Sequence, residues 1–279
     1  MSPALAVLLI VAATAVAIVA ILIVRRRAPE GSYFADGDRA AGGFGVLATG
    51  FSVLLGLIIF LAFSSYDDSR SGAETEALVV TQQYETAQFL PAAVRADLSS
   101  ELVCYARSIV YREWPRLDSG EQDDEANPWG VALFDTLRRT KPQSVTAQSA
   151  YDHWLDLTAT REEARKDRIH GAVGVIPEPL WAVLLFIALV IFGYTLFFAD
   201  SGERARSQAM LAGSVTAVIA AMLLLIQFLD DPYRDGIGGL QPVAMERTLG
   251  ILGQEKAITG QAGKLPCDET GLPTAAGIS

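Results

Sequence analysis

Apolar and polar residues follow one another in long blocks along this chain. Four blocks, each close in length to one membrane span, carry almost no charge; they cover residues 4–24, 44–63, 180–199 and 209–229. A helix needs about 20 apolar residues to cross the hydrocarbon layer of a bilayer. The two-residue alternation of transmembrane β-strands is absent from these blocks. The pattern therefore predicts an all-α polytopic membrane protein with four transmembrane helices.

The first block is expected to be a retained span. Residues 1–4 carry no basic side chain, whereas Arg25, Arg26 and Arg27 follow the apolar stretch directly. A cleaved signal peptide shows the opposite order, with positive residues before its apolar region and small residues after it.

The region between the second and third blocks predicts a helical extramembrane domain. Val94, Leu98, Leu102, Tyr105 and Ile109 recur at three- and four-residue spacing, which is typical of one helix face. The second span is expected to continue as a helix to about residue 89, because the stretch after it contains no proline before Pro91. Further helices are expected over residues 91–113, ending before Pro115, and over residues 128–140 and 144–170.

The chain after the fourth block is rich in Gly, Thr, Ala and Pro beyond residue 250, which favours a flexible tail. The predicted organisation is a first span with its cytoplasmic loop (1–43), a second span (44–63), a helical extramembrane domain (64–176), a third and fourth span (177–229) and an acidic, largely flexible tail (230–279).

Basic residues near short loops predict the orientation in the membrane. The loop after the first span carries Arg25, Arg26, Arg27 and Arg39, and the loop between the last two spans carries Arg204 and Arg206. Short loops rich in Lys and Arg stay in the cytoplasm. We therefore expect a multi-pass protein of the cell membrane whose helical domain and both termini are extracytoplasmic.

The net charge of -10 lies mainly in the two regions predicted outside the membrane. Residues 64–176 contain 12 basic and 19 acidic side chains, and residues 230–279 contain 4 and 7. This acidic balance argues against nucleic acid as a partner, because nucleic-acid binders present a basic patch. The excess of arginine over lysine and the abundance of alanine hint at a bacterial source with GC-rich DNA.

Cys104 and Cys267 are the two cysteines of the chain, and both fall in regions expected outside. In an oxidising compartment they could form a disulfide that ties the tail to the helical domain. The alternative is a buried thiol at Cys104 and an incidental thiol at Cys267.

Catalytic and metal-binding patterns are missing from the sequence. His153 and His170 have no Cys or carboxylate at ligand spacing. The acidic residues Asp123, Asp124 and Glu125 lack the alternating ligand pattern of a calcium loop. We therefore expect no enzymatic activity, no metal and no cofactor.

Small residues mark the second span, and they allow two interpretations. Glycine, serine and threonine permit close packing of another helix, or they leave room along a narrow pore in which phenylalanine forms a constriction. The candidate pore-lining residues are Gly45, Thr49, Ser52, Gly56 and Phe60.

Three arginines, Arg161, Arg165 and Arg168, share one face of the helix predicted before the third span. One interpretation is surface ion pairs with neighbouring carboxylates such as Glu162, Glu163 and Asp167. The other is a vestibule near the membrane that attracts small anions, or a contact with anionic lipid headgroups.

The order of two spans, a helical domain and two further spans resembles the bestrophin-like family of bacterial membrane proteins. The resemblance covers most of residues 43–249. The residues that carry it are Ser65-Tyr66-Asp67, Glu76-Ala77, Glu113-Trp114-Pro115, Arg161, Arg165 to Arg168, Pro179-Leu180-Trp181, Asp231-Pro232-Tyr233 and Gly236.

The resemblance implies a function in ion conduction. Bestrophins proper are pentameric chloride channels whose second span lines the pore, which implies a homo-oligomer in the lipid bilayer and a small anion as the conducted species. They hold both termini and the helical domain in the cytosol, whereas the arginine distribution here predicts the opposite side. The alternative function is a non-conducting, membrane-anchored scaffold or sensor whose helical domain binds a partner.

Overall fold

The computed structural model describes residues 3–119, 127–234, 236, 238–258 and 265–274. The chain forms two compact units. The first comprises Met1–Ser65, Gly174–Asp231 and Asp235–Gly238, and the second comprises Tyr66–Val173, Pro232–Arg234 and Gly239–Ser279. Among the described residues the regular elements are all helices, so the predicted all-α class is confirmed.

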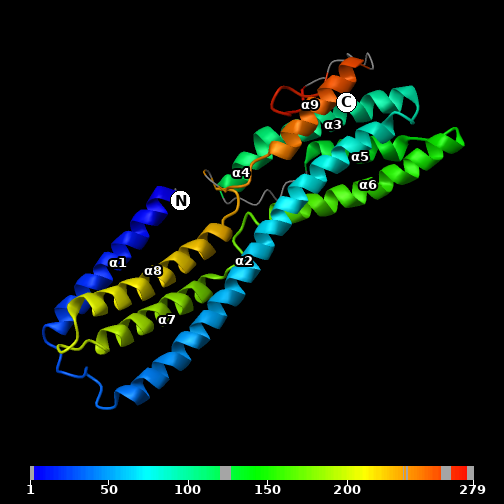
Figure 1. Ribbon diagram of the computed structural model, residues 1–279. Coiled ribbons are helices and arrows are strands. Elements are labelled where there is room, and N and C mark those ends of the chain that lie inside the picture. Colours follow the sequence, from blue (N-terminus) through cyan, green and yellow to red (C-terminus); the bar gives the residue numbers. More distant parts are fainter. Residues whose placement is uncertain (1–2, 120–126, 235, 237, 259–264, 275–279) are drawn as a thin grey trace. The chain divides into compact units, whose positions relative to one another are not determined.

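The first unit is a bundle of apolar helices (Figure 1). It contains α1 (Pro3–Arg25), the first part of α2 (Gly37–Ala87), α7 (Glu178–Phe197) and α8 (Ala205–Leu229). Each of these helices is long and apolar enough to cross a membrane, and each contains one of the apolar blocks. The prediction of four transmembrane helices is thereby confirmed.

Helices α1 and α8 approach each other closely at Gly213. A Cβ atom added there would lie 3.1 Å from the Cδ1 atom of Ile18 and 3.5 Å from the Cγ2 atom of Thr14. Small residues at such positions allow helix backbones to come together in a membrane.

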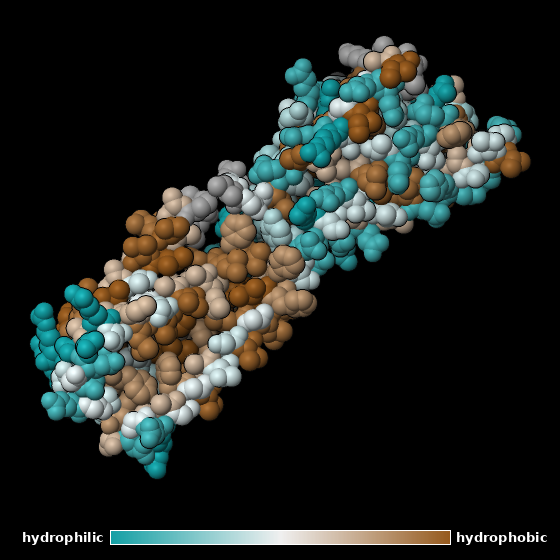
Figure 2. Space-filling model, viewed as in Figure 1, coloured by the Kyte–Doolittle hydropathy of each residue, from teal (hydrophilic) through white to brown (hydrophobic). Residues whose placement is uncertain are grey.

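The outer surface of the first unit is apolar. Figure 2 shows brown, hydrophobic side chains along these helices. Val46, Leu189 and Met210 are 77%, 67% and 77% exposed. A water-soluble surface rarely carries a contiguous apolar area of this kind, whereas a lipid-facing surface requires it.

The two arginine-bearing loops lie at the same end of the first unit. The amide of Ser201 donates to the carbonyl of Pro29 (3.4 Å), and Nη2 of Arg25 donates to the carbonyl of Ser201 (3.0 Å). Phe34 packs against Tyr194 and Phe198 at this end. Both loops therefore face the same side of a membrane that this unit spans.

The second unit is built from the remainder of α2 together with α3 (Ala92–Ser108), the π-helix η1 (Ile109–Glu113), α4 (Trp114–Asp118), α5 (Pro128–Arg139), α6 (Val145–His170) and α9 (Val243–Ile258). Helix α2 runs unbroken to Ala87, as the sequence predicted. Side chains that begin two of the helices follow the usual N-cap preference. The Asn127 side chain accepts from the amide of Trp129 (2.9 Å), and the Ser144 hydroxyl accepts from the amide of Ala147 (3.1 Å).

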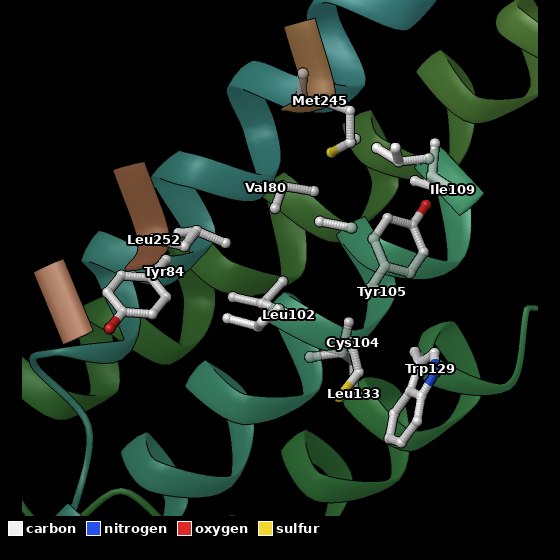
Figure 3. Packing of buried hydrophobic residues seen from close by; sticks show 14 of the residues in the cluster. Val80, Tyr84, Leu102, Cys104, Tyr105, Ile109, Trp129, Leu133, Met245 and Leu252 are labelled. Atoms are coloured by element: carbon white, nitrogen blue, oxygen red, sulfur yellow. The ribbon is translucent and has the colours of Figure 1, made fainter. Parts of the chain in front are cut away.

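Aromatic and aliphatic side chains from α2, α3, α5 and α9 fill the interior of the second unit (Figure 3). Tyr84, Leu102, Ile109, Leu133 and Leu252 are each at most 1% exposed.

The prediction that the helix over residues 91–113 ends before Pro115 is wrong. The chain passes from α3 through the π turn η1 into α4 without a break, and Pro115 lies in the first turn of α4. Proline has no N–H to donate, and its ring crowds the carbonyl four residues earlier. The wider π turn lies directly before this proline, and Glu113 is at its end.

The structure of the tail also differs from the expected flexible segment. Val243–Ile258 forms α9, whose Leu252 and Met245 are buried in the core. Cys267 forms a disulfide with Cys104, with Cα atoms 5.8 Å apart. The carbonyl of Gly271 accepts a hydrogen bond from Nε1 of Trp129 (2.6 Å). The composition of the tail did not predict these contacts, because a few residues are enough to make them.

Helices α2 and α6 approach each other closely at Gly72 of α2. A Cβ atom there would lie 2.7 Å from the carbonyl oxygen of Ala164 and from the amide nitrogen of Arg168. We predict that Gly72→Ala lowers the stability of the second unit by about 2 kcal/mol, the scale of overpacking in a core. Thermal unfolding followed by circular dichroism in mild detergent measures the change.

The control is Gly250→Ala in α9, where an added Cβ meets no described atom within 4 Å. That change should leave the unfolding midpoint unchanged or raise it, because alanine favours helix. Equal midpoints for the two variants would contradict close packing at Gly72.

Candidate functional site

Oppositely charged side chains meet in the interior of the second unit. Nε of Arg168 donates to Oε2 of Glu76 (2.5 Å), and Nη2 donates to Oε2 of Glu113 (2.7 Å). Arg168 and Glu76 are 0% exposed, and Glu113 is 4% exposed. One guanidinium therefore joins two carboxylates inside a helical core, and we call Glu76, Glu113 and Arg168 the buried charge network.

Neutral side chains donate further hydrogen bonds to the two carboxylates of this network, whereas Nη1 of Arg168 has no hydrogen-bond partner among the described residues. The hydroxyl of Tyr105 donates to Oε1 of Glu76 (2.5 Å), and Nδ2 of Asn127 donates to Oε1 of Glu113 (2.6 Å). Buried carboxylates require such partners, because an unmatched charge in a core is costly. The network thus connects α2, α3, the end of η1, the start of α5 and α6.

Two aromatic residues cover the backbone and guanidinium of Arg168. The Tyr233 hydroxyl donates to the carbonyl of Arg168. The Trp114 ring packs edge-on against Tyr233 at 5.4 Å, and the Cζ atom of Arg168 lies 5.8 Å from the centre of the Trp114 ring. The indole N–H of Trp114 donates to the carbonyl of Leu240 (3.2 Å).

The network shifts the ionisation of its members. Burial alone would raise the pKa of Glu113, but Arg168 and Arg165 with the hydrogen bonds from Arg168 and Asn127 outweigh it and hold that pKa below its ordinary value. Burial would lower the pKa of Arg168, yet Glu76 and Glu113 raise it well above its ordinary value. Burial, followed by the charge of Glu76, raises the pKa of Tyr105. Arg168 and Glu113 are therefore both charged at neutral pH.

The three arginines of the predicted stripe do lie on one face of α6, but that face points into the second unit. Arg161 is 1% exposed, and the side chain of Arg165 is 16% exposed. The expected ion pair between Arg161 and Glu162 is present, at 2.8 Å, although Arg161 itself is buried. For Arg168, surface pairing is wrong, because its partners are the buried Glu76 and Glu113. Arg168 is neutralised by its two carboxylates, whereas Nη2 of Arg165 lies 3.5 Å from Oε1 of Glu113 without a hydrogen bond.

Arg161 lines a pocket of about 330 Å³ together with Arg165. Its Nη1 donates to Oε1 of Gln83 (3.1 Å), its Nη2 donates to Oε1 of Glu162 (2.8 Å), and its Cζ lies 4.8 Å from the centre of the Tyr105 ring. The remaining lining residues are Tyr105, Asn127, Gly130, Val131, Phe134, Thr158 and Glu162.

The candidate pore-lining residues of α2 lie in the first unit. Gly45, Thr49, Ser52, Gly56 and Phe60 are all exposed within a single chain, whereas Phe51, Leu55 and Ile58 of the same helix are buried. A Cβ added at Gly45 or Gly56 meets no described atom within 4 Å. These glycines therefore do not serve helix packing within the described part of one chain.

In the described part of the chain, no group of three His, Cys, Asp or Glu side chains that could hold a metal ion gathers. Asp123, Asp124 and Glu125 lie outside the described residues.

Sequence reasoning missed the partners of Arg168. Glu76 and Glu113 were singled out only as residues that carry the family resemblance, and they lie 92 and 55 positions from Arg168. Trp114 and Tyr233, also among those residues, contact the same arginine or its neighbours. The spread-out motif residues were thus the signal that pointed to one buried cluster.

We predict that Arg168→Met destabilises the second unit by about 3–5 kcal/mol, because it leaves two buried carboxylates without their cation. In the wild type, the depressed pKa of Glu113 gives stability that is complete above the ordinary value of 4.5 and is lost as the pH falls through the lower folded value. In the variant, Arg168 no longer opposes the effect of burial, which raises the pKa of Glu113. The loss of stability relative to the wild type should therefore shrink as the pH falls from about 7 to about 5.

Thermal unfolding at both pH values tests this expectation. The matched control is Arg138→Met, which removes an exposed pair with Asp135 and should change stability by less than about 1 kcal/mol at either pH. A deficit in Arg168→Met that is small or independent of pH would contradict the ionised network.

Comparisons with known proteins agree with this architecture. Two single-substitution variants of a bacterial bestrophin homologue from Klebsiella pneumoniae share 15% identity with the chain at a TM-score of 0.63; they cover 88% and 91% of this chain and 97% and 98% of their own. A crystal structure described as a membrane protein has 16% identity, a TM-score of 0.63 and coverage of 87% and 98%. A comparison with curated proteins finds no match. The model of the Bestrophin-like domain matches residues 8–244, and the chain belongs to the Bestrophin-like family.

Proposed function

We propose that the protein is an oligomeric anion channel of the cell membrane in which Gly45, Thr49, Ser52, Gly56 and Phe60 of α2 line the pore. The observation that carries the proposal is the open face that these residues form in a single chain. Their spacing of three and four residues places them on one side of the helix.

The chemistry of this face fits a water-filled path better than a lipid contact. The lipid-exposed sides of α7 and α8 carry large apolar residues such as Leu189 and Met210. The α2 face instead carries glycines, Thr49 and Ser52, followed by Phe60 further along the helix. This order suits a narrow pore with an aromatic constriction. One chain of four spans encloses no lumen, so the proposal requires several copies around a common axis.

Family membership supports the choice of an anion. Bestrophins proper conduct chloride, and the spans of this chain carry no intramembrane acids of the kind that attract cations or relay protons. The proposed attraction of anions by the arginine stripe is kept for Arg161 and Arg165 only, because Arg168 already pairs with two carboxylates. An anion channel requires no catalytic group and no cofactor.

Cysteine modification tests the pore assignment. Among the described residues Cys104 and Cys267 are joined, so an introduced cysteine supplies the free thiol. We predict that Thr49→Cys protein in planar bilayers passes a chloride current that a charged methanethiosulfonate reagent reduces severalfold, because the adduct narrows the pore.

The matched control is Leu189→Cys on the exposed side of α7, whose current should not respond to the reagent. Equal responses at the two positions would overturn the pore assignment. An oligomer without any chloride current would favour the alternative, a non-conducting scaffold or sensor.

We further propose that the second unit lies outside the cytoplasm. The arginines of both loops at one end of the first unit support a cytoplasmic position for that end, by the positive-inside rule. The disulfide between Cys104 and Cys267 in the second unit suits an oxidising compartment, because cytosolic thiols are kept reduced.

We predict that Ser119→Cys, an exposed position after α4, reacts with a membrane-impermeant maleimide in intact cells. A cysteine at Arg39, in the first turn of α2, should react only after the cells are opened. The reverse labelling pattern would place the second unit in the cytosol.

A further inference from the structure

The pocket beside the buried charge network holds cationic groups with unused hydrogen-bonding capacity. Nε of Arg161 is buried and has no hydrogen-bond partner, and the same is true of Nε and Nη2 of Arg165. Buried donors without partners are rare and require an explanation. Both arginines line the pocket, so a ligand that enters it and displaces their present neighbours can supply the missing acceptors.

The arginines around the pocket differ in how closely a carboxylate approaches each of them. Glu113 gives its short contact, 2.7 Å, to Arg168 and leaves Arg165 at 3.5 Å. Glu162 neutralises Arg161 at 2.8 Å, but the side chain of Glu162 is 52% exposed. A ligand carboxylate that enters the pocket can therefore bind Arg165. It can also take the place of Glu162 beside Arg161, because the Glu162 side chain can rotate toward solvent.

The walls of the pocket select for more than charge. The Tyr105 ring, Val131 and Phe134 supply apolar surface, while Asn127 and Thr158 supply neutral polar groups. A volume of about 330 Å³ lies at the lower end of the range for small-molecule sites. A strongly hydrated inorganic ion would gain little from the apolar wall, whereas a carboxylate with a compact apolar body can use both parts.

We propose that this pocket, bounded by α3, α5 and α6, binds a small organic carboxylate through Arg161 and Arg165. The site lies wholly within the second unit and does not depend on conduction by the first. Binding there would make the second unit a ligand-sensing domain.

Titration of the purified full-length chain with 4-fluorobenzoate, followed by fluorine NMR, tests the proposal. Saturable binding is expected, and 4-fluorobenzamide should bind much more weakly because it lacks the charge. Arg165→Gln should weaken binding about tenfold, the scale of one charge-assisted hydrogen bond. Glu162→Gln should strengthen binding, because it removes the competing carboxylate from Arg161.

Gly130→Leu provides a test that leaves every charge in place. A side chain at Gly130 points toward Glu162, 3.8 Å from the position of the added Cβ, and would fill the pocket. Its control is Gly250→Leu in α9, where an added Cβ meets no described atom within 4 Å. Circular dichroism establishes that both variants are folded.

Loss of benzoate binding in Gly130→Leu with retention in Gly250→Leu supports the proposal. Absence of saturable binding to the wild type, equal binding of benzoate and benzamide, or weaker binding in Glu162→Gln would each overturn it. These experiments measure ligand binding and not conduction. Binding can therefore be found in a protein that conducts no chloride, and it can be absent from a protein that does.

Discussion

The contact of Arg168 with Glu76 and Glu113 is the interaction on which the second unit depends. Three charged side chains lie in a core where water cannot solvate them, so each is tolerable only while its partners stay in place. The requirement fixes α6 against α2 and against the junction of η1 and α4. Gly72 permits this approach because it leaves room for the backbone of α6.

The same network accounts for the neighbouring pocket. Glu113 accepts hydrogen bonds from both Arg168 and Asn127, and Nη2 of Arg165 stays 3.5 Å from Oε1 of Glu113 without a hydrogen bond. Arg161 stacks on the Tyr105 ring, while the hydroxyl of Tyr105 serves Glu76. A structural ion pair and a set of incompletely satisfied donors thus arise from one arrangement of helices.

The apolar blocks and helical periods were sufficient to predict the four spans, the extension of α2 and the helices α5 and α6, because these patterns are local. Helical periodicity could not predict the partners of Arg168, since they lie 55 and 92 residues away; their one mark in the sequence is their place among the residues of the family resemblance. The π turn before Pro115 depends on tertiary packing, which simple proline rules do not include. Helix α9 was missed because the expectation of a flexible tail rested on the composition beyond residue 250, whereas the helix begins at Val243 and is anchored by Met245 and Leu252.

The open glycine face of α2 gains a role only if several chains assemble around it. A single chain leaves Gly45, Thr49 and Gly56 exposed, and a ring of copies would turn them toward a shared lumen. Native mass spectrometry of the protein released from lipid nanodiscs measures this assembly most directly. We expect a single closed oligomer whose mass is a multiple of 29.9 kDa. A species of 29.9 kDa alone would contradict it.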